Sequence, residues 1–156
     1  MALSIGAKAP DFKLPDTEKK ERSLTEFLGK KTIVAFFPGA FTGACTKELC
    51  QLRDTMSDFN SMNAQVIGIS VDSPFANKAF ADANKLGFPL LSDYTRAAIK
   101  AYGIVHDGFA GLKGYAAAYR SIFVLDKTGA VKYAWVTENP GIEPPYDEIN
   151  RALSSF

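Results

Sequence analysis

The chain has few of the residues that bind metals or cross-link small folds. Its 156 residues include two cysteines, Cys45 and Cys50, and one histidine, His106. Two cysteines do not form a disulfide framework, and with one histidine they are too few soft ligands for a tetrahedral zinc site. We therefore expect no structural metal, and we expect the cysteines to be either reactive or simply buried.

The sequence also lacks an excess of one charge and any long apolar run. Eighteen basic and seventeen acidic residues leave a net charge of +1, which argues against nucleic acid or a membrane surface as a partner. The longest apolar runs, such as Ile33 to Phe37, are far shorter than the roughly 20 residues that cross a bilayer. The first residues do not have the pattern of a secretory signal, so we expect a cytoplasmic protein.

What the sequence does contain is a large apolar fraction, 47%, arranged in alternating strand and helix patterns. A chain of this length can bury a full core without cross-links, so we expect one domain over residues 1–156. Buried strands are expected at residues 32–37, 65–71 and 89–91, and helices at 42–60, 73–86 and 95–102. This alternation is typical of a parallel α/β core.

The segments before and after this core are expected to form further elements. A short strand near residues 12–14 and a short helix opened by the Ser23–Glu26 capping box form an N-terminal extension. Residues 104–118 are expected to be a long loop, followed by a hairpin of strands at 119–125 and 130–136 and a closing helix at 146–154. The sequence therefore predicts an α/β class protein with a thioredoxin-like fold, in which a mixed central sheet is flanked by helices.

The segment from Phe36 to Cys50 combines a buried strand, a tight turn and a cysteine at a helix start. The apolar positions from Cys45 to Phe59 recur at spacings of 4, 3, 4 and 3, so Cys45 lies in the first turn of an amphipathic helix, on its buried face. Thr42 occupies the expected cap position. Unpaired N–H groups and the helix dipole favour negative charge there, so we predict a lowered pKa and a reactive thiolate for Cys45.

This segment resembles the peroxiredoxin motif, in which a proline is followed by three residues and a threonine, then by two residues and a cysteine. Pro38, Thr42 and Cys45 match every fixed position of that motif. The resemblance extends over almost the whole chain and is to the bacterioferritin-comigratory and AhpE-like branches of the AhpC/TSA superfamily. The other matching positions are Ala9–Phe12, Glu48, Phe88–Asp93, Arg120 and Asp126–Gly129.

The resemblance implies a thiol-dependent peroxidase that reduces hydrogen peroxide and organic hydroperoxides without metal, haem or flavin. Cys45 would become a sulfenic acid. Thr42 would accept a hydrogen bond from the peroxide, Arg120 would face both the thiolate and the leaving oxygen, and Pro38 would shield the sulfur. Glu48 would orient the arginine and threonine. Thioredoxin, glutaredoxin or a small thiol would then supply electrons. The resemblance also implies a possible homodimer, because the family often dimerises through loops around the active site.

Cys50 is the resolving thiol by the same resemblance, forming an intramolecular disulfide with Cys45. Five residues of α-helix separate two Cα atoms by roughly 8.6 Å and turn the side chains about 140° apart. A disulfide needs Cα atoms closer than about 7 Å, so the start of the helix must unwind before the bond can form. The alternative is that Cys50 is a buried spectator and an external thiol resolves Cys45.

Simpler interpretations of the same residues stay open at this stage. Cys45 could be a small buried apolar residue, Arg120 an exposed arginine at a strand end, and Glu48 a solvated surface carboxylate. A cysteine hydrolase would need a histidine base, for which His106 is the only candidate. A disulfide exchanger would normally present two cysteines separated by two residues, whereas four intervene here, and a cysteine phosphatase would need an arginine just after Cys45. A non-enzymatic thioredoxin-like binding module is the remaining alternative.

Overall fold

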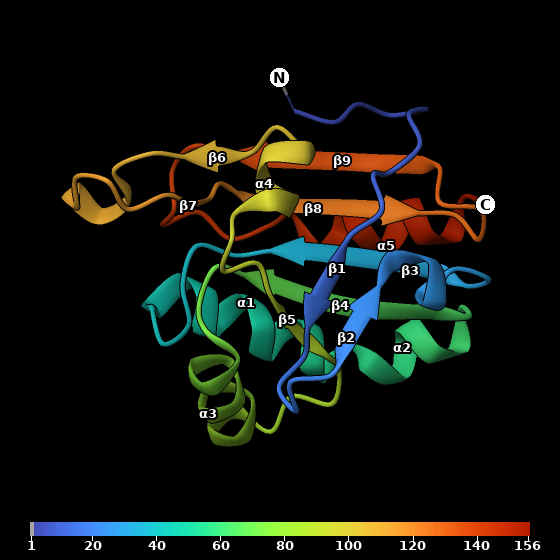
Figure 1. Ribbon diagram of the computed structural model, residues 1–156. Coiled ribbons are helices and arrows are strands. Elements are labelled where there is room, and N and C mark those ends of the chain that lie inside the picture. Colours follow the sequence, from blue (N-terminus) through green and yellow to red (C-terminus); the bar gives the residue numbers. More distant parts are fainter. Residues whose placement is uncertain (1) are drawn as a thin grey trace.

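A five-stranded mixed sheet forms the centre of the computed structural model, which describes residues 2–156 (Figure 1). Its strands lie in the order β5-β4-β3-β8-β9, in which β5, β4 and β3 are parallel, β8 is antiparallel to β3, and β9 is antiparallel to β8. The strand bounds are β3 Lys31–Phe36, β4 Ala64–Ser70, β5 Leu90–Ser92, β8 Arg120–Leu125 and β9 Val131–Thr137. The predicted mixed sheet of a thioredoxin-like α/β protein is confirmed.

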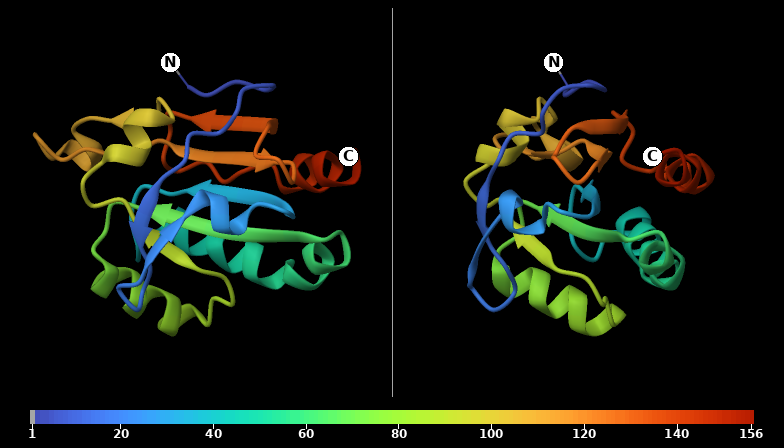
Figure 2. Two further views of the ribbon diagram at one scale, coloured as in Figure 1. Left: turned by 45° about the vertical axis from the view of Figure 1, so that its right-hand side comes forward. Right: turned by 90° about the vertical axis from the view of Figure 1, so that its right-hand side faces the viewer.

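Alternation along β3 divides the core into two layers. Val34 and Phe36 pack against the N-terminal segment and α4 on one face, whereas Ile33 and Ala35 pack against α1, α2 and α5 on the other. Figure 2 shows this division, with the N-terminal segment on one side of the sheet and the helices α1 and α5 on the other. The helices are α1 Gly43–Asp54, α2 Met56–Ser61, α3 Pro74–Asn84, α4 Ala97–Ala101 and α5 Tyr146–Ser154.

The N-terminal extension has the short elements that its sequence predicts. Strands β1 (Lys13–Pro15) and β2 (Glu21–Ser23) pair in an antiparallel ladder and lead into a 3-10 helix at Leu24–Phe27. Glu26 accepts a hydrogen bond from the Ser23 backbone N–H at 3.0 Å, as a capping box requires. This segment covers one face of the sheet with Phe12, Leu14 and Leu24.

Two element predictions are wrong in detail. The helix expected over residues 42–60 is interrupted at Thr55, whose hydroxyl donates to the carbonyl of Gln51 at 2.7 Å and so competes with the regular helical bonds. The loop expected over 104–118 contains a two-residue ladder, β6 (Val105–His106) with β7 (Ala117–Ala118), and a 3-10 turn at Phe109–Gly111. Strands of two residues are too short for alternation to reveal them in a sequence.

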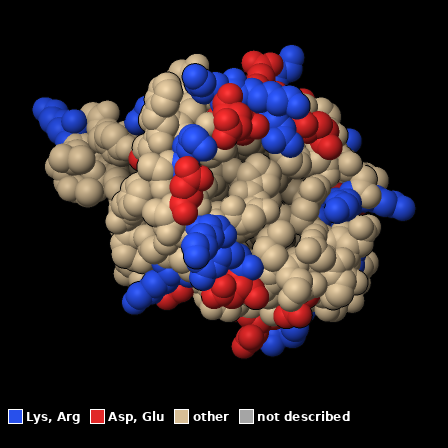
Figure 3. All heavy atoms as spheres, turned by 90° about the horizontal axis from the view of Figure 1, so that it is seen from below, with Lys and Arg blue, Asp and Glu red and all other residues tan. Residues whose placement is uncertain are grey.

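Two features that the composition predicts, a mixed surface charge and short apolar segments, can be compared with the structure. On the face shown in Figure 3, basic and acidic side chains are interspersed around an uncharged area. Among residues 2–156, none of the helices has both the length and the apolarity that a bilayer crossing demands.

Candidate active site

The turn between β3 and α1 brings Cys45 into the core. After Phe36 the chain reverses through Pro38, which is buried, and Phe41, which has a left-handed φ of 64°. Helix α1 then begins with Thr42 as its N-cap residue, so Cys45 is the third helical residue and is 0% exposed. The predicted position of the cysteine, at a helix start and facing inward, is confirmed.

Thr42 has the predicted position but not the predicted capping bond. Its side chain makes no hydrogen bond to a helix N–H; instead its hydroxyl donates to the carbonyl of Gly39 at 2.8 Å. Because its proton is directed to Gly39, the oxygen of Thr42 retains lone pairs that can accept a further hydrogen bond.

Sheet topology brings Arg120 to the same place from the far part of the sequence. Arg120 is the first residue of β8, which runs antiparallel to β3, and its neighbour Ser121 pairs with Phe36 at the end of β3. The first residue of one strand therefore lies beside the turn that follows the other. The Arg120 side chain is 1% exposed, it donates a hydrogen bond to Glu48, and its charge acts to lower the pKa of the Cys45 thiol. The alternative of an exposed strand-end arginine is wrong.

Glu48 forms a buried ion pair with this arginine. Glu48 Oε1 lies 2.6 Å from Arg120 Nη1, and the two side chains are 0% and 1% exposed. The second guanidinium nitrogen, Nη2, donates to the carbonyl of Pro140 at 2.5 Å. Glu48 Oε2 and Arg120 Nε have no hydrogen-bond partner among the described residues. Burial raises the pKa of Glu48 to about 7, against the lowering effect of the Arg120 charge.

The predicted lowering of the Cys45 pKa is not observed. Burial raises the pKa of this thiol above its ordinary value, because a thiolate in an apolar core loses its hydration. The charge of Arg120, the Thr42 hydroxyl and the backbone of Gly39 act in the opposite direction, and the charge of Glu48 adds to the rise. The helix start favours the thiolate, but the cost of complete burial, which local sequence does not reveal, is larger.

Two contacts of the site had no signal in the sequence. The carbonyl of Pro140, in the loop after β9, fixes the arginine from the side opposite Glu48. Asp72, directly after β4, accepts a hydrogen bond from the backbone N–H of Ala40 at 2.8 Å and another from Ser70 at 2.8 Å. Asp72 therefore connects the active-site turn to the end of the neighbouring strand.

Cys50 lies in the same helix as Cys45 but in a different environment. It is partly buried, and its thiol donates to Asn84 Oδ1 in α3 at 3.5 Å. The two cysteines are both free. Since α1 is a regular helix across both positions, the predicted separation stands, and a bond between the two sulfurs requires local unwinding.

His106 is not among the groups that act on the Cys45 thiol in the described part of the chain. Its ring stacks on Tyr119, with centroids 4.7 Å apart, and its edge packs against Phe109. The His106 ring is therefore packed between two aromatic side chains.

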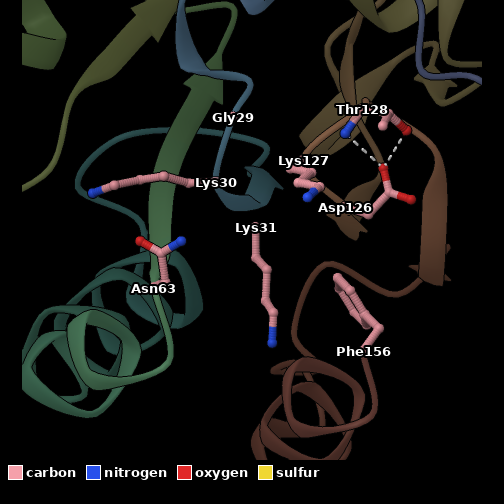
Figure 4. A pocket seen from close by; sticks show the side chains of 8 residues that line it. All are labelled: Gly29, Lys30, Lys31, Asn63, Asp126, Lys127, Thr128 and Phe156. Carbon is pink, nitrogen blue, oxygen red and sulfur yellow. Dashed lines mark hydrogen bonds between the residues drawn. The ribbon is translucent and has the colours of Figure 1, made fainter.

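A separate pocket lies at the other end of the sheet, where β3 begins (Figure 4). Three lysines, Lys30, Lys31 and Lys127, contribute to its lining together with Phe156. Lys31 donates to the carbonyl of Leu153 at 2.6 Å and lies over the Phe156 ring at 4.9 Å, so its charge is already used within the protein. This pocket is distinct from the turn that carries Cys45.

A caged cysteine that faces a buried guanidinium on a thioredoxin-like sheet defines the class as a thiol-dependent oxidoreductase. Comparison with known proteins gives the family. The family model described as AhpC/TSA family matches residues 5–134. The chain is 41% identical over 156 residues to the chloroplastic peroxiredoxin Q of Sedum lineare, covering 99% of this chain and 80% of that protein. It is likewise 41% identical over 156 residues to the chloroplastic peroxiredoxin Q of Populus jackii, covering 99% and 70%.

Solved structures agree with this result. The crystal structure of peroxidoxin BcpB from Mycobacterium tuberculosis superimposes with a TM-score of 0.87 at 29% identity, covering 97% of each chain. The chain therefore belongs to the AhpC/TSA family of peroxiredoxins, with relatives in the peroxiredoxin Q and bacterioferritin-comigratory branch. It is a thiol peroxidase.

Proposed function

We propose that Cys45 is the peroxidatic nucleophile and that the protein reduces hydrogen peroxide and organic hydroperoxides. The Cys45 thiolate attacks one peroxide oxygen, the O–O bond breaks, and the sulfur becomes a sulfenic acid. The second oxygen takes up a proton and leaves as water or an alcohol. The observation that carries this proposal is the buried guanidinium of Arg120, which pairs with Glu48 at 2.6 Å and whose charge acts to lower the pKa of the Cys45 thiol.

Each neighbouring side chain has a defined part in this proposal. Arg120 stabilises both the thiolate and the negative charge that grows on the leaving oxygen, because its fork of donors can face two acceptors at once. Thr42 accepts a hydrogen bond from the peroxide, since its own proton goes to Gly39. Glu48 orients the arginine through the 2.6 Å ion pair, and the buried ring of Pro38 keeps water from the sulfur.

The rise in pKa that burial causes at Cys45 is compatible with this chemistry. Arg120 is permanently charged, so the thiolate, once formed, remains paired in the low-dielectric site. A thiolate of higher pKa is also the stronger nucleophile. Burial therefore lowers the share of Cys45 that is ionised, the charge of Arg120 opposes this loss, and the thiolate that does form is a strong nucleophile.

Cys50 is proposed to resolve the sulfenic acid as an intramolecular disulfide. In the balanced step, Cys50 sulfur attacks Cys45 sulfur, the S–O bond breaks, and the Cys50 proton leaves with the hydroxide as water. The presence of both cysteines on α1, with one thiol already partly exposed, supports this proposal.

The remaining parts of the proposal are the reductant, the domain organisation, the location in the cell and the oligomeric state. Thioredoxin, glutaredoxin or a small thiol returns the disulfide to the reduced state. We further propose that residues 1–156 act as one domain, that the protein works in the cytoplasm, and that a homodimer can form around the active-site loops.

Stopped-flow fluorescence tests the peroxidase proposal directly. Trp135, the only tryptophan, packs against the core cluster that contains Cys45 and reports its oxidation. We expect Cys45→Ser to abolish peroxide consumption coupled to thioredoxin, and Cys50→Ser to leave a sulfenic acid that a dimedone probe labels. His106→Ala should retain full activity. A Cys45 that reacts with peroxide no faster than free cysteine would overturn the proposal and favour a binding module.

A further inference from the structure

Asn84, the last residue of α3, contacts two residues of α1, Cys50 and Arg53. Its side-chain oxygen accepts the Cys50 S–H at 3.5 Å, and its backbone carbonyl accepts from Arg53 Nη1 at 2.6 Å. Its amide nitrogen donates to the carbonyl of Phe80 at 3.0 Å. Because the nitrogen is engaged within α3, the oxygen is directed at the thiol.

The same helix contacts the other end of the active-site segment. Phe80 packs edge-on against Phe41 with ring centroids 5.2 Å apart, and against Phe37 at 5.9 Å. Phe41 precedes the first turn of α1 and has a left-handed backbone, which costs energy for a residue with a side chain. Helix α3 therefore contacts both the strained turn before Cys45 and the thiol of Cys50.

We propose that Asn84 is a positioning residue for Cys50, which holds this thiol at α3 and away from Cys45 until α1 opens, and so sets the rate of disulfide formation. The inference rests on the proposed role of Cys50 as the resolving thiol. Cys50 must leave Asn84 before it can reach the sulfenic acid, because the two Cα atoms are too far apart in the intact helix. The lifetime of the sulfenic acid then depends on the strength of this contact.

A longer-lived sulfenic acid has a chemical consequence. A second peroxide can oxidise it to sulfinic acid, which is not reduced by ordinary thiols. The Asn84 contact therefore also sets the peroxide concentration at which the enzyme inactivates itself. A weaker contact gives faster disulfide formation and greater resistance to inactivation.

Asn84→Ala and Asn84→Asp separate this role from a structural one. Asn84→Ala removes the acceptor, so we expect the first-order disulfide step to be about 2- to 10-fold faster, the factor that one net hydrogen bond produces. Asn84→Asp keeps an oxygen that can accept from the thiol, so we expect a rate equal to or below wild type. A merely structural residue would give the same direction for both, since either change weakens the bond to Phe80.

The experiment follows Trp135 fluorescence and quenched samples after one equivalent of hydrogen peroxide. The second-order oxidation of Cys45 should stay within twofold of wild type in both variants, whereas only the later first-order phase changes. Asp82→Ala, an exposed substitution in the same turn of α3, is the matched control and should leave both phases unchanged. Mass spectrometry should show less sulfinic acid in Asn84→Ala than in wild type at excess peroxide.

Two negative outcomes would separate the proposed role of Cys50 from that of Asn84. If oxidised wild-type protein contains no Cys45–Cys50 disulfide in a non-reducing peptide map, the resolving role fails and the inference fails with it. If wild type forms the disulfide but Asn84→Ala does not accelerate it, or Asn84→Asp accelerates it equally, the role of Asn84 alone is overturned.

Discussion

At the scale of single residues, Arg120 is the side chain that contacts the other polar groups of the site. Its guanidinium interacts with the Cys45 sulfur, pairs with Glu48 and donates to the carbonyl of Pro140. Lysine could supply the charge but not several donors in one plane. The proposed chemistry therefore requires the shape of the guanidinium as well as its charge.

The substitution Arg120→Lys tests this dependence. We expect kcat/KM for hydrogen peroxide to fall by roughly 100- to 1,000-fold, because donors to the developing charge are lost while the net charge is kept. Competition kinetics against a peroxidase of known rate would measure it. Arg22→Lys, in the partly exposed pair with Asp16, is the control and should leave the rate unchanged. Equal activity in the two variants would contradict the proposed role of Arg120.

At the scale of elements, the strand β3, the turn after it and the helix α1 form one unit whose packing admits little extra volume. Gly68 of β4 lies between this unit and β5. A Cβ atom at Gly68 would lie 2.6 Å from Leu90 Cδ2 and 3.3 Å from Leu49 Cδ1 of α1. Glycine is therefore needed here for space, since its φ is not in the left-handed region.

For Gly68→Ala we expect a loss of about 2 kcal/mol in the free energy of unfolding, because fully buried leucines must move to make room. The midpoint of thermal unfolding should fall by roughly 4–8 °C in a chain of this size. Gly87→Ala is the matched control, since a Cβ there meets nothing within 4 Å. A midpoint within a degree of wild type would show that Leu90 and Leu49 adapt freely.

At the scale of the whole molecule, one buried carboxylate influences how total stability depends on pH. The folded state raises the pKa of Glu48 to about 7 from an ordinary 4.5 through burial. Between these values the folded state binds more protons than the unfolded state, so stability falls as pH rises. Glu48 therefore favours the folded state most below pH 4.5 and least above pH 7.

The substitution Glu48→Gln removes this titration. We expect the stability of wild type relative to Glu48→Gln to decrease by up to about 3 kcal/mol between pH 4.5 and pH 7.5, since each pH unit of pKa difference corresponds to about 1.4 kcal/mol. Urea unfolding of the reduced proteins at several pH values would measure the difference. Parallel profiles for the two proteins would mean that Glu48 keeps an ordinary pKa in the folded state.

Local patterns were sufficient for much of this molecule. The strand before Pro38, the helix after Thr42, the inward direction of Cys45 and the closing helix at Tyr146–Ser154 all follow from apolar spacing and capping residues near in the chain. The break at Thr55 and the short β6–β7 ladder did not, because each depends on one side chain or two residue pairs.

The sequence by itself determined that Cys45 lies at a helix start and faces the core, because both features depend on apolar spacing and capping residues close to it in the chain. Only the tertiary structure decided what surrounds that sulfur. Arg120 and Glu48 are 72 positions apart in the chain and meet because β8 pairs with β3. The contacts of Pro140, Asp72 and Asn84, and the complete burial that raises the Cys45 pKa, likewise come from strand order and helix packing. No local pattern encodes such contacts, since they exist only after distant segments have been brought together.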